Sequence, residues 1–312
     1  MLPAARGIEP GALADAFAGV SVPWMLAGCA CQGISVMAQS LAWRLGLVAG
    51  GMGPVLLRHV VSANWIGQAG NAVLPGRMGE AARVIVVRRH LHPDCAQLSR
   101  IAGSVVAQRL INAAACFVVV VAGVVSVPVV VPLPGGRWAA LGALAGALAL
   151  LLAARCTPLG RTMGRALPAR LRRAGQGFAA GAGLLRAGRA AAVAFALHLA
   201  SLVAQLATVA FVLRGFGVAV PVSAALVVFV LLAVSSLVPA APGGLGVAQA
   251  AIVAPLGAVY GVAANLALAF ALGLQATVAA VAISGGMAGV VHQRLARRAA
   301  RAAAASGSPG PV

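Results

Sequence analysis

The chain has 312 residues, of which 62% are hydrophobic and only 9% are charged, and its mean hydropathy is +1.00. A soluble domain carries about a quarter charged residues, so this composition excludes an ordinary soluble protein and predicts a multi-pass α-helical membrane protein. The 23 basic residues outnumber 4 acids, for a net charge of +19. Because the arginines lie between apolar runs, they indicate membrane topology and anionic lipid headgroups rather than a nucleic-acid partner.

A series of apolar segments follows an N-terminal segment, residues 1–21, in which we expect no cleavable signal sequence because acids and prolines interrupt it. In chain order the predicted segments are Val22–Trp43, Pro54–Leu74, Gly79–Val87, Ile101–Val127, Trp138–Ala154, Ala190–Leu213, Val222–Val238, Leu245–Val259 and Val262–Val291. At ~1.5 Å rise per residue, Val22–Trp43 is about one bilayer long, whereas Gly79–Val87 is too short to span.

The arginines predict the orientation of these segments. The loop 155–189 is the most arginine-rich, so the positive-inside rule places it in the cytoplasm, together with the basic tail 293–312, which we expect to be disordered. Ala190–Leu213 then runs outward and Val262–Val291 runs inward. The region 222–259 between them starts and ends outside, either as two full spans or as one re-entrant hairpin, and the Pro-Gly break near its middle favours the hairpin.

The first half shows the same pattern with the opposite orientation. Arg44 and Arg58 mark one cytoplasmic loop, and Arg88 and Arg89 mark the next. The region between these loops therefore starts and ends in the cytoplasm. Its second arm is the short segment Gly79–Val87, which favours a hairpin that enters the membrane from the cytoplasmic side.

The bends of the two predicted hairpins share the pattern Pro-Gly-x-(Met/Leu)-Gly. The residues at these breaks are Pro75, Gly76, Gly79, Pro242, Gly243, Gly244, Gly246 and Gln249. Interrupted hydrophobic segments at corresponding positions of two oppositely oriented halves indicate an inverted repeat. We therefore predict an all-α helix bundle whose membrane domain, residues 22–292, consists of two inverted halves, 22–154 and 190–292, each with a re-entrant hairpin.

A helix that starts at such a break offers a binding site for an anion. A break in lipid is tolerated only where it is buried in protein or lines a cavity, and the free N–H groups of the new helix suit a phosphate. Arg77, beside the first break, adds a forked donor for phosphate or carboxylate. The alternative is that each proline merely kinks its helix.

A small set of polar side chains falls near the first hairpin and the following span. The candidate headgroup-binding residues are Arg77, Glu80, Arg83, Arg109, Asn64, Asn71, Gln108 and Asn112. Asn64, Gln68 and Asn71 share one helix face, which suits either interhelical hydrogen bonds or the lining of a cavity.

The charged members of this set leave two interpretations open. Glu80 either stabilises a helix start and pairs with Arg77 or Arg83, or contacts a headgroup amine or a proton. Arg109 either extends to the cytoplasmic interface or faces the bundle interior, where it pairs with Glu80 or a lipid phosphate. The polar neighbours Gln108 and Asn112 favour the interior.

We predict no metal site, cofactor or catalytic group. The segment 90–95, which reads HLHPDC, contains metal-ligating residue types, but it lies in a short loop beside the membrane with no partner cluster. The serines have no His/Asp arrangement around them, so the sequence gives no argument for nucleophilic catalysis.

Three stretches carry a family resemblance: Asn64–Arg83, which reads NWIGQAGNAVLPGRMGEAAR, then Gln108–Leu110 and Pro242–Gly246. They resemble the lysylphosphatidylglycerol synthase transmembrane region family, also called the flippase-like domain family, over roughly residues 15–292. The resemblance implies an integral membrane bundle that moves or presents polar lipids. Its best-known members, the multiple peptide resistance factors, flip aminoacylated phosphatidylglycerol, and other members are linked to hopanoid or glycolipid pathways.

The chain departs from the family in two respects. The resistance factors carry a cytosolic aminoacyltransferase domain after the membrane region, and we expect none in this chain, so it should not be a lysyltransferase itself. Three amides, Gln108, Asn112 and Gln249, also stand where the resemblance leads us to expect acids. Amides keep hydrogen bonding but lose charge and proton exchange, which weakens the expectation of cationic-lipid recognition and of proton coupling.

The predicted function is the translocation or presentation of polar lipids in the bacterial cytoplasmic membrane, with the C-terminus in the cytoplasm. The expected partners are membrane lipids, either an anionic phospholipid or a polyprenyl- or hopanoid-type lipid. The alternative is a non-transporting partner or scaffold of a lipid- or glycolipid-modifying enzyme. A lipid-modifying transferase ranks last, because Glu80 is the one acid placed for acid–base chemistry.

Overall fold

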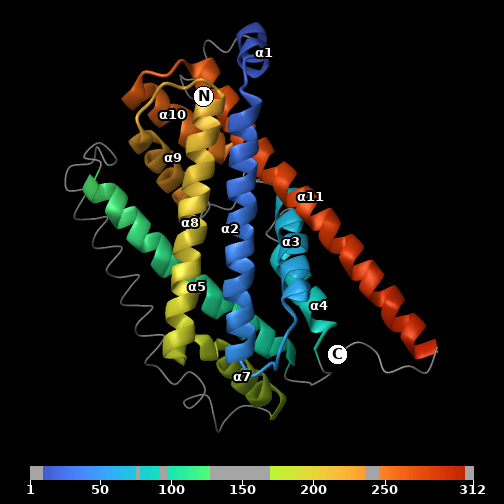
Figure 1. Cartoon of the computed structure of the whole chain (residues 1–312). Helices are drawn as coiled ribbons and strands as arrows, with labels where there is room; N and C mark the ends of the chain where they lie inside the picture. Colours follow the sequence, from blue (N-terminus) through green and yellow to red (C-terminus); the bar gives the residue numbers. More distant parts are fainter. Residues whose placement is uncertain (1–9, 75–77, 92–96, 127–168, 236–245, 306–312) are drawn as a thin grey trace.

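The computed structural model describes residues 10–74, 78–91, 97–126, 169–235 and 246–305. These residues form α-helices and one 3-10 helix, and they contain no strand, which confirms the predicted all-α bundle (Figure 1). In chain order the elements are α1 (Pro10–Ala18), α2 (Val22–Ala49), α3 (Leu57–Val73), α4 (Gly79–Arg88), α5 (Gln97–Ser126), α7 (Ala169–Gly181), η3 (Ala182–Arg186), α8 (Gly188–Gly215), α9 (Val222–Ser235), α10 (Val247–Tyr260) and α11 (Ala264–Ala305).

Four of the described helices, α2, α5, α8 and α11, are long and apolar enough to cross a membrane. Each corresponds to a predicted span, although all four are longer than the sequence predicted. Helix α2, for example, continues past Trp43 to Ala49, because most residues after Trp43 are good helix formers and the single Gly46 lowers the propensity without ending the helix. The predicted span Trp138–Ala154 lies outside the described residues.

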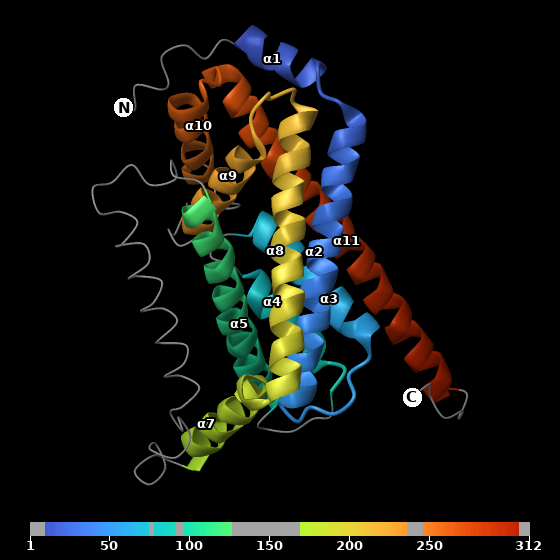
Figure 2. The ribbon, with the colours of Figure 1, turned by 60° about the vertical axis from the view of Figure 1, so that its left-hand side comes forward.

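Helices α2 and α8 form the antiparallel axis of the bundle (Figure 2). At one end, here called the α1 end, the Ser21 amide donates to the Gly215 carbonyl at 2.9 Å. Halfway along, the hydroxyl oxygens of Ser35 and Ser201 lie 2.8 Å apart in a hydrogen bond. At the other end, here called the α7 end, α2 meets η3 and α7. This pair supplies two walls of the site described below.

Helices α3 and α4 form a hairpin that starts and ends at the α7 end. The ring of His59 near the start of α3 stacks on that of His90 just after α4, with 3.8 Å between ring centroids. Helix α4 has 10 residues, which gives a length of ~15 Å, about half of a hydrocarbon core of ~30 Å. This short second arm is what the sequence predicted.

Helices α9 and α10 form a second pair, which packs at the α1 end. Each has 14 residues, or ~21 Å, and so is also shorter than a full span. Ile252 and Leu256 of α10 pack in one apolar cluster with Phe216, after α8, and Phe270 of α11. The two helix pairs thus start from opposite ends of the bundle, as re-entrant hairpins would. The inverted relation of the two halves stays a prediction.

Helix α11 runs from the α1 end to the α7 end and beyond the bundle (Figures 1 and 2). Its glycines allow close packing on α3: a Cβ on Gly289 would lie 2.9 Å from the Ser62 carbonyl oxygen, and one on Gly286 would collide with the Ala69 methyl. The predicted disordered tail from residue 293 is wrong up to Ala305, where the helix ends. The cause is composition, because alanine and arginine are among the strongest helix formers.

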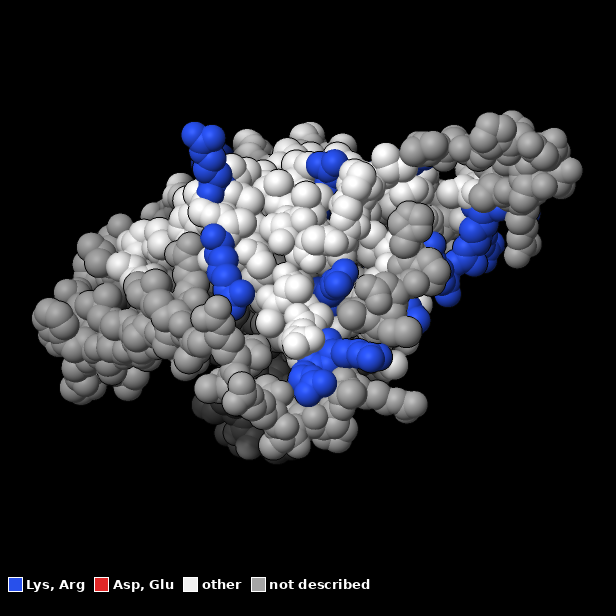
Figure 3. Space-filling view, turned by 90° about the horizontal axis from the view of Figure 1, so that it is seen from below, with Lys and Arg blue, Asp and Glu red and all other residues white. Residues whose placement is uncertain are grey.

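The α7 end carries most of the described arginines. Those at this end are Arg44, Arg58, Arg88, Arg89, Arg100, Arg172, Arg173, Arg186 and Arg189. Figure 3 views this end, and arginine side chains lie on it with no described acidic side chain in view. Arg214 belongs to the α1 end, where its guanidinium lies 5.4 Å from the ring centroid of Trp24. The charge of the described residues is therefore concentrated at one end of the bundle.

Candidate functional site

A polar cavity of about 220 Å³ lies inside the bundle of otherwise apolar helices. Its walls come from α2, α3, α4, α5 and α8. The lining residues are Gln39, Asn64, Gly67, Gln68, Asn71, Glu80, Arg83, Gln108, Arg109, Asn112, His198, Leu202 and Gln205. Because this lining is mostly polar, the cavity suits a lipid headgroup rather than acyl chains.

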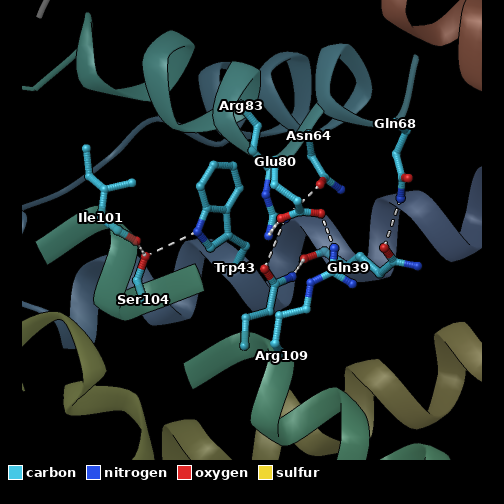
Figure 4. Close-up of polar contacts among 10 residues, drawn as sticks. Gln39, Trp43, Asn64, Gln68, Glu80, Arg83, Ile101, Ser104 and Arg109 are labelled. Carbon is cyan, nitrogen blue, oxygen red and sulfur yellow. Dashed lines mark hydrogen bonds and ion pairs between the residues drawn. The ribbon is translucent and has the colours of Figure 1, made fainter. Parts of the chain in front are cut away.

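Arg83 of α4 is the centre of the charged wall of this cavity (Figure 4). Its side chain is 5% exposed and forms an ion pair with Glu80 at 2.6 Å. Its Nη1 donates to the side-chain oxygens of Asn64 and Gln108, each at 3.2 Å. The guanidinium also lies 4.7 Å from the ring centroid of Trp43, a cation–π contact. One arginine thereby ties α4 to α2, α3 and α5.

Glu80 lies between two arginines. One carboxylate oxygen pairs with Arg83 and the other with Arg109 of α5. The predicted pairings of Glu80 with Arg83 and of Arg109 with Glu80 are therefore present. Arg109 lines the cavity, yet its side chain is 50% exposed, against 25% for Glu80. A guanidinium has five N–H donors, so Arg109 can hold Glu80 and still bind an anion.

Three glycines allow α4 to approach α3 closely enough to form this wall. A Cβ on Gly79, the first residue of α4, would collide with the Gly67 carbonyl oxygen. A Cβ on Gly67 would lie 3.0 Å from the Cβ of Arg83, and one on Gly70 would lie 2.9 Å from the Cα of Gly79. Small residues at such contacts are typical of helix packing in membranes. They place Glu80 and Arg83 against the polar face of α3.

Helix α2 holds the partners of Arg83 in place. Asn64 donates to the Ser40 hydroxyl at 3.0 Å and to the Val36 carbonyl at 3.3 Å, while Gln108 donates to the Gln39 carbonyl at 3.1 Å. Both amides therefore use their oxygen for Arg83 and their nitrogen for α2. Asn64 and Gln108 are also 2% and 4% exposed. Their geometry is that of residues that position Arg83.

A second polar network crosses the cavity wall between α2, α3 and α8. The Gln39 amide donates to the Ser201 hydroxyl at 3.0 Å and accepts from the Gln68 amide at 3.1 Å. Gln205 also donates to the Ser201 hydroxyl, at 3.2 Å. These hydrogen bonds satisfy amides that would otherwise be costly to bury in a membrane helix.

Sequence reasoning missed Gln39, His198 and Gln205, all of which line the cavity. A signal was present in their spacing. Ser35 and Gln39 are four residues apart in α2, and His198 and Gln205 are seven apart in α8, so each pair lies on one helix face. Polar residues at helical spacing inside an apolar span indicate a face that meets protein or a cavity.

The structure brings most of the predicted headgroup-binding residues to one place. Asn71 and Asn112 join Asn64, Glu80, Arg83, Gln108 and Arg109 around the cavity. Other predicted site residues lie outside the described residues, namely Pro75, Gly76, Arg77, Pro242, Gly243 and Gly244.

The described part of the second break does not line the cavity. Gly246 has a positive φ of 87°, and its amide donates to the Gln249 side-chain oxygen at 2.6 Å. The Gln249 amide in turn donates to Gln275 of α11. This arrangement caps the start of α10 and fastens it to α11. In the structure, Gln249 therefore has a capping role.

Comparison with protein families gives one match, which covers most of the chain. The model described as "Lysylphosphatidylglycerol synthase TM region" matches residues 1–285 of the 312-residue chain. A comparison with individually curated proteins gives no match.

Proposed function

The chain belongs to the lysylphosphatidylglycerol synthase TM region family, and from this premise we propose that it translocates the headgroup of a polar lipid across the membrane through the cavity. Four of the described helices are long and apolar enough to cross a membrane, and together with the family this makes the chain a multi-pass membrane protein linked to lipid handling. The family corresponds to the membrane region of lysylphosphatidylglycerol synthases and not to their catalytic domain. Translocation itself is the step that we add.

The observation that carries the proposal is the charged, hydrogen-bonded cavity within the bundle. Polar and ionised groups inside a membrane protein are costly and mark paths for polar cargo. Here Glu80, Arg83 and Arg109 meet at a cavity that also has seven amide side chains in its lining. A lipid headgroup is the polar cargo that a membrane supplies, and its acyl chains can remain in the lipid beside the bundle.

The roles of the lining residues follow from their exposure. Arg109 binds the phosphate, because it is half exposed at the cavity. Asn71 and Asn112 line the same space and contact the rest of the headgroup. Glu80 and Arg83 hold Arg109 and the α3–α4 hairpin in position. We propose that the halves then rock to expose the headgroup alternately to each side.

We place this activity in a bacterial cytoplasmic membrane, with the α7 end in the cytoplasm. The arginines gathered at that end support this orientation, because cytoplasmic loops of membrane proteins carry an excess of basic residues. The C-terminal end of α11, which carries Arg294, Arg297 and Arg298, lies on the same side. The partner lipid is anionic, with a phospholipid and a polyprenyl phosphate as the two classes to test.

The test is transbilayer movement in vesicles that contain the purified protein. Fluorescent lipids in the inner leaflet of empty vesicles are protected from a membrane-impermeant quencher, and a translocating protein removes that protection. We expect rapid loss of protection with the wild-type chain and with Arg172→Ala, a control on exposed α7. Arg109→Ala should slow movement at least tenfold while the protein stays folded. No movement above empty vesicles, for any anionic phospholipid or polyprenyl phosphate, contradicts the proposal.

A further inference from the structure

Three histidines from three separate segments meet at the α7 end of the bundle. His59 lies near the start of α3, His90 follows α4, and His292 lies on α11. The ring centroids of His59 and His90 are 3.8 Å apart in a stack, and that of His292 lies 5.8 Å from His59. None of the three is among the described residues that line the cavity. They therefore join the α3–α4 hairpin to α11 at a contact that the proposed function does not use.

Gln293 of α11 strengthens the same contact through both ends of its amide. Its oxygen lies 2.6 Å from Nε2 of His90, and because an amide oxygen only accepts, the histidine ring donates. Its nitrogen donates to the Ser62 hydroxyl of α3 at 2.6 Å. Gln293 is 5% exposed, so these hydrogen bonds are shielded from water. One side chain of α11 thus binds both arms of the hairpin.

The surroundings of the histidines favour neutral rings. His59 is 8% exposed, and its Nδ1, like Nε2 of His292, is buried without a described hydrogen-bond partner. A protonated ring has an N–H on both nitrogens, so charging it would bury a donor that no described acceptor pairs. Burial, followed by the nearby His90, lowers the pKa of His59 from 6.5 to about 4. Arg58 and His292 lower this pKa as well, so the ring is neutral at neutral pH.

The charged groups around the contact would not compensate a proton. Toward the α7 end, the charged residues that the structure describes on α2, α3, α4 and α11 are all arginines, namely Arg44, Arg58, Arg88, Arg89, Arg294, Arg297 and Arg298. The two acids in the described part of the chain lie elsewhere, Asp15 on α1 and Glu80 at the cavity. A charge on the stacked rings would therefore be repelled by its neighbours and would meet no described carboxylate.

We propose that His59, His90 and His292 form a pH-sensitive latch, which holds the α3–α4 hairpin against α11 while the rings are neutral and releases it when His59 is protonated. The latch joins the two predicted halves, 22–154 and 190–292, so its release removes a restraint on their rocking. This consequence rests on the proposed function, whereas the release itself does not.

Proton linkage gives the direction and the size of the effect. A released His59 ring in water regains a pKa near 6.5, which is above its value in the latch. The latch is therefore fully favoured above about pH 6.5 and loses this advantage as the pH falls towards about 4. Between about pH 7.5 and about pH 5, the ratio of released to latched protein should rise about thirtyfold.

The reactivity of a thiol at the contact measures this release. Ser62→Cys, in a variant without the native cysteines, replaces a side chain that is 4% exposed and lies beside Gly289 of α11. The purified full chain reacts in detergent with 2,2′-dithiodipyridine. The rate is divided by that of Ala174→Cys on exposed α7, which cancels the pH dependence of the reaction itself. We expect the normalised rate to rise about thirtyfold from about pH 7.5 to about pH 5, because only released molecules react.

Three further variants separate the latch from general loosening. His59→Phe keeps a ring that stacks but removes the proton site, so the rise should fall to about twofold or less. His198→Phe is the matched control, since it replaces a buried histidine of α8 at the cavity and should leave the rise unchanged. Thr277→Cys, at a position that is 5% exposed and further toward the α1 end of α11, should show no rise.

A normalised rate that stays constant with pH overturns the latch, and so does an equal rise in the His59→Phe background or at Thr277→Cys. The two proposals fail separately. Labelling that depends on pH, without transbilayer movement in vesicles, contradicts translocation and leaves the latch standing. Movement without pH-dependent labelling does the reverse. Where both occur, movement at about pH 5 should be faster in the wild type than in His59→Phe, and equal rates overturn the effect of the latch on rocking.

Discussion

At the level of single residues, the site depends on Arg83, a buried cation with partners on four helices. It forms an ion pair with Glu80 on its own helix and donates hydrogen bonds to the side-chain oxygens of Asn64 and Gln108. Its guanidinium also lies over the ring of Trp43. Removing one member of a buried ion pair leaves the rest uncompensated, which is why such residues affect stability strongly.

Arg83→Ala should therefore lower the free energy of unfolding by about 3–5 kcal/mol, because Glu80 and two buried amide oxygens lose a partner. Arg83→Lys should cost less, since it keeps the charge but cannot reach all the acceptors from one forked group. Unfolding in detergent, followed by circular dichroism, gives the values. Arg172→Ala on exposed α7 should stay within about 0.5 kcal/mol of wild type. Equal values for Arg83→Ala and Arg172→Ala would contradict this role.

Gly79 allows α4 to pack closely against α3, and this contact can be tested by substitution. Gly79→Ala would press a methyl group into the Gly67 carbonyl and separate α4 from α3, so we expect a loss of about 1–3 kcal/mol. Gly33→Ala on α2 is the matched control, because no atom lies within 4 Å of the added Cβ. Alanine is the better helix former, so the control should be neutral or more stable by up to about 1 kcal/mol. Melting temperatures in detergent should separate the two variants in opposite directions.

At the level of elements, sequence reasoning placed the hairpins better than the cavity walls. The start of α4 at Gly79 follows from a proline-glycine break, and its end follows from Arg88, so local signals sufficed. His198 and Gln39 each share a helix face with other polar residues of an apolar span, but the sequence does not say which neighbouring helix that face meets. That information is tertiary. The continuation of α11 to Ala305 was available from helix propensity, but the basic charge of the segment suggested a tail.

The start of α10 is held by a side-chain cap. Gln249 caps the helix by accepting a hydrogen bond from the Gly246 amide. Gln249→Ala should therefore lower the free energy of opening this turn by about 1 kcal/mol, which corresponds to about fivefold faster amide exchange over residues 246–250. Gln249→Glu keeps the acceptor and adds a charge that suits a helix N-terminus, so exchange there should not rise. Hydrogen–deuterium exchange with mass spectrometry measures both. Equal acceleration in the two variants would argue against the cap.

At the level of the whole molecule, charge predicts orientation. The described arginines cluster at the α7 end, and the loop after α8 lies at the α1 end. Single cysteines at exposed Ala174 and Ala219, in a variant without the native cysteines, report the side of each end. A membrane-impermeant maleimide should label Ala219→Cys in intact cells and Ala174→Cys only after permeabilisation. The reverse pattern would invert the proposed direction of the bundle.

The buried Arg83 also sets the order in which the protein can be built. A lone arginine at the centre of a membrane helix costs about 2.5–3.5 kcal/mol on insertion scales, and α4 has only 10 residues to offset it. Gln108, one of its partners, belongs to α5, which is synthesised after α4. We therefore expect the α3–α4 hairpin to reach its final position only after α5 has entered the membrane and completed the partners of Arg83. A chain that fails to insert α5 should then leave this hairpin accessible to protease, which limited proteolysis of a variant with a disrupted α5 would detect.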